Sequence, residues 1–300
     1  MSILILITKA KNTIFMAQLI HMRDRIHAIE TIHKITHAMR LISMSHHARL
    51  KHKEEGLQRY VHELNTLFLK VKAQVPTWQH EILYPTTRYN RQLIIIVSSQ
   101  KGLCGSFNTV LFKFIDHDLT RLVGGPLDVV VIGKRALEYV QDHGVGTVVQ
   151  EIDFFSYKNI VECVEQVAKY LSLGQRRYDR VIMYANYPKT FFVQMPQAYV
   201  LVPFLQHEAQ TMAELNELMQ DYVWEQPADI ILVDLVYQCL QATIHNLLFR
   251  SLVAEQAARF ISMDGATRNA KTLIESTRLQ YNKLRQAKIT REIIELSEVI

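Results

Sequence analysis

Apolar residues in the first part of the chain recur at alternating steps of four and three positions. This spacing is typical of a coiled-coil seam, in which two long helices pack along one face. The runs predict a continuous helix over residues 16–75, with a local overwinding where two runs are joined by a step of three. The three runs are Leu57, Val61, Leu64, Phe68, Val71 and Val75; Ile32, Ile35, Met39 and Ile42; and Met22, Ile26 and Ile29.

The last part of the chain carries a second heptad frame, whose chemistry changes along its length. The frame is apolar at first, then polar, and apolar again at the end. This pattern predicts a helix that leaves its helical partner and meets another surface. Its members are Ile244, Leu247, Ala254, Ala258 and Ile261; then Arg268, Thr272, Glu275, Asn282 and Gln286; and Leu279, Ile289, Ile293, Leu296 and Ile300.

Proline sets the limits of these helices. All seven prolines lie between Pro76 and Pro227, and a proline inside a helix costs about 3 kcal/mol. The flanks are free of proline. Because one flank enters the middle region and the other leaves it, we expect the two helices to pair antiparallel. The predicted segments are an N-terminal extension (1–15), an N-terminal coiled-coil helix (16–75), a central α/β domain (76–227) and a C-terminal coiled-coil helix (228–300).

The middle region alternates short apolar runs with helical stretches. Residues 93–97, 128–132 and 181–185 read as buried strands, and residues 106–122, 134–141 and 160–171 read as helices. Alternation of this kind, with short turns, predicts a mainly parallel sheet in a Rossmann-like α/β domain. The predicted fold is therefore α/β, with a long antiparallel two-helix coiled coil added by the two ends.

Charge and cysteine content narrow the function classes. The net charge is +5, and basic residues dominate both ends while acidic residues dominate the middle, so the ends need an acidic partner. We do not expect nucleic acid, because the basic helix is interleaved with apolar residues that need burial. Three widely spaced cysteines indicate neither a disulfide framework nor a zinc site. No run of 18 apolar residues is present, so we expect no membrane-spanning helix.

Candidate chemistry is sparse. The turn from Ser99 to Ser106 follows a strand and has two glycines, but it lacks the third glycine of a dinucleotide fingerprint and the ending of a P-loop. We interpret it as a tight turn, with Cys104 in a structural role. His33 and His37 lie four residues apart, and a solvated basic face explains them better than a metal site. We therefore predict no catalytic, cofactor or metal site, and the alternative is a free-standing α/β nucleotide-binding enzyme.

Three segments carry a resemblance to a known family, the gamma subunits of F-type ATP synthases. The first, residues 23–39, resembles the family pattern R-x-R-I-x-S-I-x-x-T-x-K-I-T-x-A-M. The second is Gly102-Leu103-Cys104-Gly105-Ser106-Phe107-Asn108, similar to G-L-C-G-x-x-N. The third and most specific runs from Ser251 to Arg259, through Met263 and residues 266–270, to Tyr281-Asn282-Lys283-Leu284-Arg285-Gln286-Ala287-Lys288-Ile289-Thr290-Arg291-Glu292.

The resemblance implies the rest of the assignment. Gamma subunits form the central rotor shaft, which turns inside a ring of alpha and beta subunits and meets the epsilon subunit and the c-ring at its base. Proton flow through the c-ring thus drives ATP synthesis on the beta subunits, and ATP, ADP and Mg bind those partners. The resemblance implies a non-catalytic subunit, peripheral to the cytoplasmic face of a bacterial inner membrane.

The family's contact residues carry over by position. Contacts with the beta subunits fall on Arg259, Gln286, Thr290 and Met39. The apolar bearing at the top of the ring falls on Ile289, Ile293, Leu296 and Ile300, and the contact with the c-ring on Tyr222, Trp224 and Glu225. The sequence departs from the family after Met39, where bulkier Leu41, Ile42 and Met44 replace small residues. His37 and His46 stand where the family usually has lysine.

Overall fold

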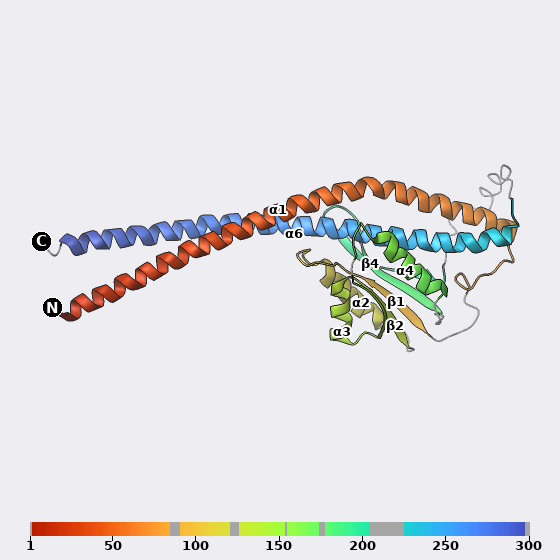
Figure 1. Cartoon of the computed structure of the whole chain (residues 1–300), viewed down its shortest axis with the longest axis horizontal. Helices are drawn as coiled ribbons and strands as arrows, with labels where there is room; N and C mark the ends of the chain where they lie inside the picture. The colour runs from red at the N-terminus through yellow and green to blue at the C-terminus, as the bar shows by residue number, and fades with distance from the viewer. Residues whose placement is uncertain are drawn as a thin grey trace. The chain divides into compact units, whose positions relative to one another are not determined.

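Two long helices form the two ends of the chain. A computed structural model describes residues 2–84, 91–120, 126–153, 155–173, 178–204 and 225–297. Helix α1 spans Ser2–Gln74 and α6 spans Ala228–Ser297, and each is drawn as one uninterrupted helix (Figure 1). α6 begins directly after Pro227, the last proline. α1 already begins at Ser2, so the boundary expected at residue 15 does not coincide with the end of a helix.

The chain divides into two compact units, and both long helices contribute to each. The helix-pair unit consists of residues 1–42 and 260–300. The sheet unit consists of residues 43–259 and holds the remaining elements. This division differs from the four predicted segments, because it falls within α1 and α6 rather than at their ends. The predicted segment boundaries stay predictions.

The sheet unit is built on five strands. They are β1 (Gln92–Val97), β2 (Leu127–Ile132), β3 (Thr147–Ile152), β4 (Arg180–Pro188) and β5 (Gln194–Val202), in the spatial order β3-β2-β1-β4-β5. The first four are parallel, and Ile95 lies between Val130 on β2 and Met183 on β4. β5 pairs antiparallel with β4. The predicted α/β class with a mainly parallel sheet and long terminal helices is confirmed.

Helices cover both faces of this sheet (Figure 1). On one face, α2 (Phe107–Leu119) and α3 (Lys134–His143) pack on residues such as Ile94, Ile96 and Val131. On the other face, α4 (Ile160–Leu173) and the nearby parts of α1 and α6 pack on Ile95 and Val97. Strand residues alternate between the two faces, which is why the short apolar runs had to be buried on both sides.

Within the sheet unit, α1 and α6 run antiparallel and share the larger core. Leu64, Phe68 and Val71 are buried there, and the thiol of Cys239 on α6 lies 3.8 Å from the Leu64 carbonyl oxygen. The predicted seam over residues 57–75 therefore faces inward. Its apolar spacing buries three layers of side chains against α6, α4 and the sheet.

One window of eighteen residues in α6 is apolar enough to cross a membrane by length and composition alone. The expectation that no helix spans a membrane stays a prediction. A core helix passes the same test, and packing explains the composition here. Buried apolar residues of α6 between Leu232 and Val253 lie in the core beside the sheet.

Candidate functional site

The helix-pair unit has a seam that mixes polar and apolar side chains. From α1 it buries Ile29 and Thr36, and from α6 it buries Met263, Thr267, Ala270, Ile274 and Thr277, at alternating steps of four and three. Ile29 packs on Ala270 and Ile274, forming the small apolar cluster of this unit. Other layers bring hydroxyls or charges together. The two helices are therefore held here by directional bonds as well as by apolar contact.

Three polar contacts cross this seam in antiparallel order. The hydroxyl oxygens of Thr36 and Thr267 lie 3.1 Å apart, and Thr267 also donates to the Met263 carbonyl oxygen at 2.7 Å. The Arg40 guanidinium donates to the Asp264 carboxylate at 2.8 Å, and this bond lowers the pKa of Asp264. Arg268 adds a second ion pair to the same carboxylate at 2.7 Å. A carboxylate with two guanidinium partners stays ionised and fixes the register locally.

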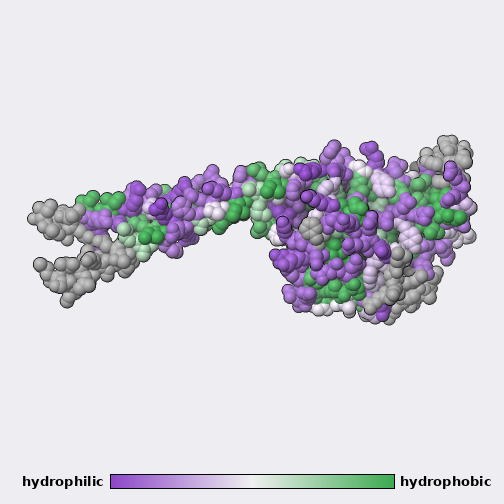
Figure 2. Space-filling model, viewed as in Figure 1, coloured by the Kyte–Doolittle hydropathy of each residue, from purple (hydrophilic) through white to green (hydrophobic). Residues whose placement is uncertain are grey.

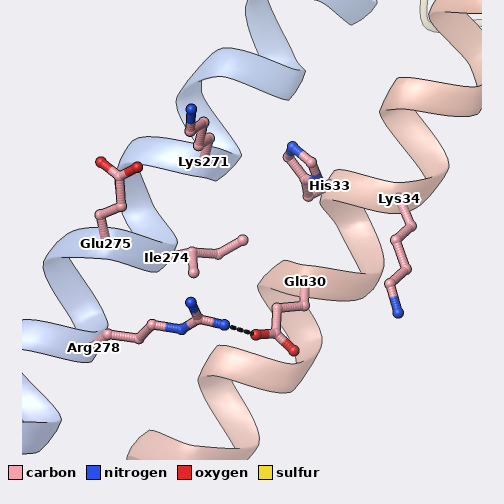
Figure 3. A pocket seen from close by; sticks show the side chains of 7 residues that line it. All are labelled: Glu30, His33, Lys34, Lys271, Ile274, Glu275 and Arg278. Atoms are coloured by element: carbon pink, nitrogen blue, oxygen red, sulfur yellow. Dashed lines mark hydrogen bonds and ion pairs between the residues drawn. The ribbon is translucent and has the colours of Figure 1, made fainter.

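The third contact lies beside a shallow groove between the helices. Arg278 on α6 donates to Glu30 on α1 at 2.5 Å, and this hydrogen bond lowers the pKa of Glu30 (Figure 3). The groove has a volume of about 300 Å³. His33 and Ile274 point toward each other across it, whereas Lys34 points away. Glu30 and Arg278 form an ion pair with each other, so neither presents an unpaired charge to a ligand in the groove.

The apolar run predicted to form this part of the seam lies on the outside instead. Ile32, Ile35 and Ile42 are 52%, 54% and 54% exposed, and Met39 is half-buried. The prediction was wrong because two stripes compete on α1. Alternating steps of four and three continue backward from Leu57 through Glu54, Leu50, His47, Ser43, Arg40, Thr36 and His33 to Ile29, and all of these are buried or half-buried.

This continuous frame removes the need for the predicted overwinding. Its spacing does not change along α1, whereas its chemistry does: the frame is apolar from Leu57 to Val75 and mixes polar and apolar residues from Glu54 back to Ile29. Apolar residues are thereby turned outward, where Figure 2 shows green apolar atoms among purple hydrophilic ones along the helix pair. The exposed apolar residues of α1 in this unit are Met16, Ile20, Ile32, Ile35, Leu41 and Ile42. We call them the α1 outer stripe.

The predicted frame of α6 behaves in a similar way. Its first members, Ile244, Leu247, Ala254 and Ala258, are buried in the sheet unit, as their apolar character required. Beyond them the frame turns to the surface. α6 does not leave α1 there, because it pairs through another face. The exposed members are Arg268, Thr272, Glu275, Leu279, Asn282, Gln286, Ile289 and Ile293.

The residues predicted to contact beta subunits fall into two groups. Gln286 and Thr290 are exposed on the outer face of α6, next to exposed Ile289 and Ile293. Met39 is half-buried on α1. Arg259 is different, because it is 8% exposed and belongs to the sheet unit. The structure thus brings Gln286 and Thr290 onto one accessible face but not Arg259.

The remaining predicted contact residues are only partly described. Glu225 is exposed just before α6, whereas Tyr222 and Trp224 lie outside the described residues. The side chains of Leu296 and Ile300 also lie outside the described part of the structure. Their assigned roles remain predictions.

The turn between β1 and α2 is tightly organised. The main-chain N–H of Ser99 donates to Asn108 Oδ1 at 3.1 Å, and Asn108 Nδ2 donates to Ser99 Oγ at 2.8 Å. Leu103 has a φ of 66°, which a bulky side chain rarely adopts. Burial raises the pKa of the Cys104 thiol, so the thiol stays protonated and is a poor nucleophile. This agrees with the structural role predicted for the cysteine.

Arg259 and Glu255 meet this turn from α6. Arg259 donates to the Glu255 carboxylate and, at 3.2 Å, to the Lys101 carbonyl oxygen. Burial raises the pKa of Glu255, and the Arg259 guanidinium opposes that shift. Sequence reasoning did not identify Glu255. The signal was present, since a glutamate four residues before an arginine on a helix is favourably placed for an ion pair.

The described residues contain no group of three or more His, Cys, Asp or Glu side chains that could hold a metal ion. His33 and His37 stack with 6.3 Å between ring centroids, and His37 also contacts Arg40. A guanidinium beside an imidazole disfavours a bound cation. The absence of a metal site at these histidines stays a prediction.

Comparisons with known proteins match this chain to ATP synthase gamma chains. A family model described as ATP synthase matches residues 18–298. The ATP synthase gamma chain of Chloroherpeton thalassium is 30% identical over 298 residues, covering 94% of this chain and 96% of the relative. The gamma chain of Pelagibacter ubique is 27% identical, covering 94% and 98%.

Solved structures share the fold at low sequence identity. A chain from the rotor of the Euglena gracilis mitochondrial ATP synthase superimposes with a TM-score of 0.62 at 13% identity, covering 91% of this chain and 99% of that one. A chain from the central stalk and c-ring structure of the Tetrahymena thermophila mitochondrial ATP synthase gives 0.56 at 18% identity, covering 77% and 99%. None of these matches supports a free-standing nucleotide-binding enzyme. The chain belongs to the ATP synthase gamma chain family.

Proposed function

We propose that this chain is the gamma subunit that forms the central shaft of a rotary ATP synthase. In this role its paired helices turn inside a ring of alpha and beta subunits, and its base meets the epsilon subunit and the c-ring. Rotation then couples proton flow through the c-ring to ATP synthesis and hydrolysis on the beta subunits. Family membership supports the proposal, and the α1 outer stripe is the structural observation that carries it.

The outer stripe fits an enclosed shaft for a physical reason. Helices in water turn their apolar side inward, because burying apolar surface is favourable by about 25 cal/mol per Å². In the helix-pair unit α1 buries Ile29 but leaves the residues of the outer stripe exposed. Such a pair gains by being surrounded, since a ring around it would bury the stripe. Apolar contact also has no directional bonds that would have to break at each step of rotation.

Polar contacts between α1 and α6 hold the two helices together. The bonds of Arg40 to Asp264 and of Arg278 to Glu30 resist sliding of one helix along the other. A shaft that transmits torque needs this internal stiffness together with a surface that slips. We assign beta-subunit contacts to Gln286, Thr290 and Met39.

The remaining roles follow from the family. The end of α6, with Ile289, Ile293, Leu296 and Ile300, is proposed as the apolar bearing, and Tyr222, Trp224 and Glu225 as the contact with the c-ring. The chain is proposed to have no catalytic site and to bind neither nucleotide nor magnesium, which the partner subunits hold. Its place is then peripheral to the cytoplasmic face of a bacterial inner membrane.

Co-purification tests the proposal directly. The full chain carrying an affinity tag is expressed in its host, and detergent-solubilised membranes are purified on the tag. Alpha, beta, epsilon and c subunits are expected in the eluate, identified by mass spectrometry, and an untagged chain is the control. A tagged chain that remains soluble and never co-fractionates with alpha and beta subunits contradicts the proposal.

A second experiment tests the contact surface. In the purified complex, Gln286→Ala and Thr290→Ala are expected to lower proton-driven ATP synthesis severalfold without loss of the chain from the complex. Lys169→Ala is the control, because Lys169 is exposed on α4 of the sheet unit. Unchanged synthesis in both test variants removes these contacts and leaves the family assignment in place.

A further inference from the structure

The turn that follows β1 displays one exposed apolar side chain over a buried base. Leu103 is 58% exposed and has a left-handed backbone conformation, whereas neighbouring Cys104 is buried. Cys104 and Phe107 pack on Ala254 and Ala258 of α6. Two alanines allow close approach of the turn to the helix. A strained turn of this kind persists only where its surroundings hold it in place.

Hydrogen bonds hold the turn from three elements. Asn108 on α2 bonds both the main chain and the hydroxyl of Ser99. From β4, Asn186 donates to the Phe107 carbonyl oxygen at 2.8 Å. From α6, Arg259 donates to the Lys101 carbonyl oxygen at 3.2 Å. The last bond is charge-assisted, and bonds of this kind are roughly twice as strong as neutral ones.

Glu255 makes the α6 contact rigid. It is buried one helical turn before Arg259 and accepts a hydrogen bond from the same Nη2 atom that reaches Lys101. The guanidinium is thus held between a carboxylate on its own helix and a carbonyl of the turn. Removing the Arg259 guanidinium leaves the buried Glu255 carboxylate without its cation, which strongly destabilises the structure locally.

We propose that Arg259 is a positioning residue, which with Glu255 clamps the Ser99–Ser106 turn to α6 so that the sheet and the shaft helix move together. In this role Arg259 affects coupling through the turn and not by touching a beta subunit. Its 8% exposure leaves little of the side chain for a partner. The consequence for coupling rests on the proposed function, whereas the clamp itself is a property of the isolated chain.

The rate at which the Cys104 thiol is alkylated measures the strength of the clamp in the isolated full chain, without partner subunits. Cys104 belongs to the turn and packs on Ala254 and Ala258, so its alkylation requires the turn to lift from α6. Arg259→Ala is expected to raise the Cys104 alkylation rate about tenfold or more, because local opening no longer breaks a charge-assisted bond. Peptide mapping by mass spectrometry separates Cys104 from Cys239, which is buried beside the sheet and reports global unfolding.

Three further variants make the test specific. Arg250→Ala is the matched control, because Arg250 lies on the same helix and pairs with Glu54 and Tyr187 rather than with the turn. It is expected to leave Cys104 alkylation within about twofold of wild type. Glu255→Gln is expected to raise the rate less than Arg259→Ala does. The alkylation rate of Arg259→Lys is expected to fall between those of wild type and Arg259→Ala, because an ammonium group lacks the planar geometry with which a guanidinium bonds two acceptors.

The complex then separates positioning from direct contact. If Arg259 positions the turn, Glu255→Gln and Arg259→Ala lower the ratio of ATP synthesis to ATP hydrolysis in the same order in which they expose Cys104. Wild-type alkylation in Arg259→Ala, or lower coupling without greater exposure of Cys104, overturns the clamp. Should Arg259→Ala also expose Cys239, Glu255→Gln and Arg259→Lys decide the result. Failure of the chain to join the complex refutes the proposed function and leaves the alkylation result standing.

Discussion

The α1 frame has one spacing in both units but a different balance of apolar and polar residues. In the sheet unit the frame carries Leu64, Phe68 and Val71, which are buried in a core shared with the sheet. In the helix-pair unit the same frame carries Thr36 and Arg40 as well as Ile29, and several apolar residues lie outside. The difference indicates that the spacing of the frame determines which face of α1 packs on α6. How apolar that face is depends on the other elements that the unit packs against it.

The largest effect is expected in the apolar half of the frame. Phe68→Ala removes a side chain that is 1% exposed and packs near Trp78, with 6.4 Å between ring centroids. The lost burial and the cavity cost about 3–5 kcal/mol. Urea unfolding of the full chain measures this as a shift in midpoint. Phe192→Ala is the control, because Phe192 is 74% exposed, and a similar loss in both variants contradicts the description of the core.

The polar half of the frame should respond differently to apolar substitution. Thr36→Val leaves the buried Thr267 hydroxyl without one of its neighbours and is expected to cost about 1 kcal/mol. Thr36→Val with Thr267→Val removes both hydroxyls, and we expect it to recover that loss. The same unfolding assay measures both. A double variant that is less stable than Thr36→Val alone shows that the seam needs its hydroxyls for stability.

Acid should weaken the helix-pair unit through Asp264. Its pKa lies below the ordinary value of about 3.9, because Arg40 and Arg268 stabilise the ionised form. The stabilisation is therefore present in full above about pH 4 and is lost as the pH falls through the lowered pKa. Circular dichroism of the full chain between pH 6 and pH 2 follows the loss. Asp264→Asn should remove this part of the pH dependence, and an unchanged acid profile would contradict the assignment.

Much of the sheet unit could be read from the sequence because its apolar runs are short and bounded by turns. β1, β2 and β4 were predicted within a few residues. β3 was missed because Thr147–Ile152 is an edge strand with mostly exposed or half-buried side chains. β5 was missed because the second edge contains Pro196 and two glutamines. Edge strands carry weaker apolar patterns, so their pairing emerges only in the fold.

The outer stripe could not be predicted for a related reason. A sequence with two heptad stripes on one helix does not state which stripe faces the partner. Hydrophobicity favoured Ile35 and Ile42, whereas continuity of the frame from Leu57 selected Thr36 and Ser43. Exposure of Gln286 and Thr290 likewise depends on which face of α6 pairs. The burial of Arg259 depends on its contact with the Ser99–Ser106 turn, which is distant from Arg259 in the sequence.

The smallest effect in the isolated chain is expected from the outer stripe itself. Ile35→Ala should change the free energy of unfolding by no more than about 0.5 kcal/mol, because little surface is buried there. Ile29→Ala is the matched variant. It makes the same substitution two turns earlier on α1, where Ile29 packs on Ala270 and Ile274, and it should cost about 2 kcal/mol. Equal losses would contradict the inverted arrangement of α1.

Assembly should bring out the cost of Ile35→Ala. If a ring of partner subunits covers the stripe, the side chain becomes buried only in the complex, and truncation then weakens the complex more than the chain. The measurement is the temperature at which purified membranes lose ATP hydrolysis, compared between wild type, Ile35→Ala and Ile29→Ala. Ile35→Ala should lower this temperature although it leaves the free chain unchanged. An effect in neither state would mean that the stripe meets no partner, and the reason for an apolar exterior would have to lie elsewhere.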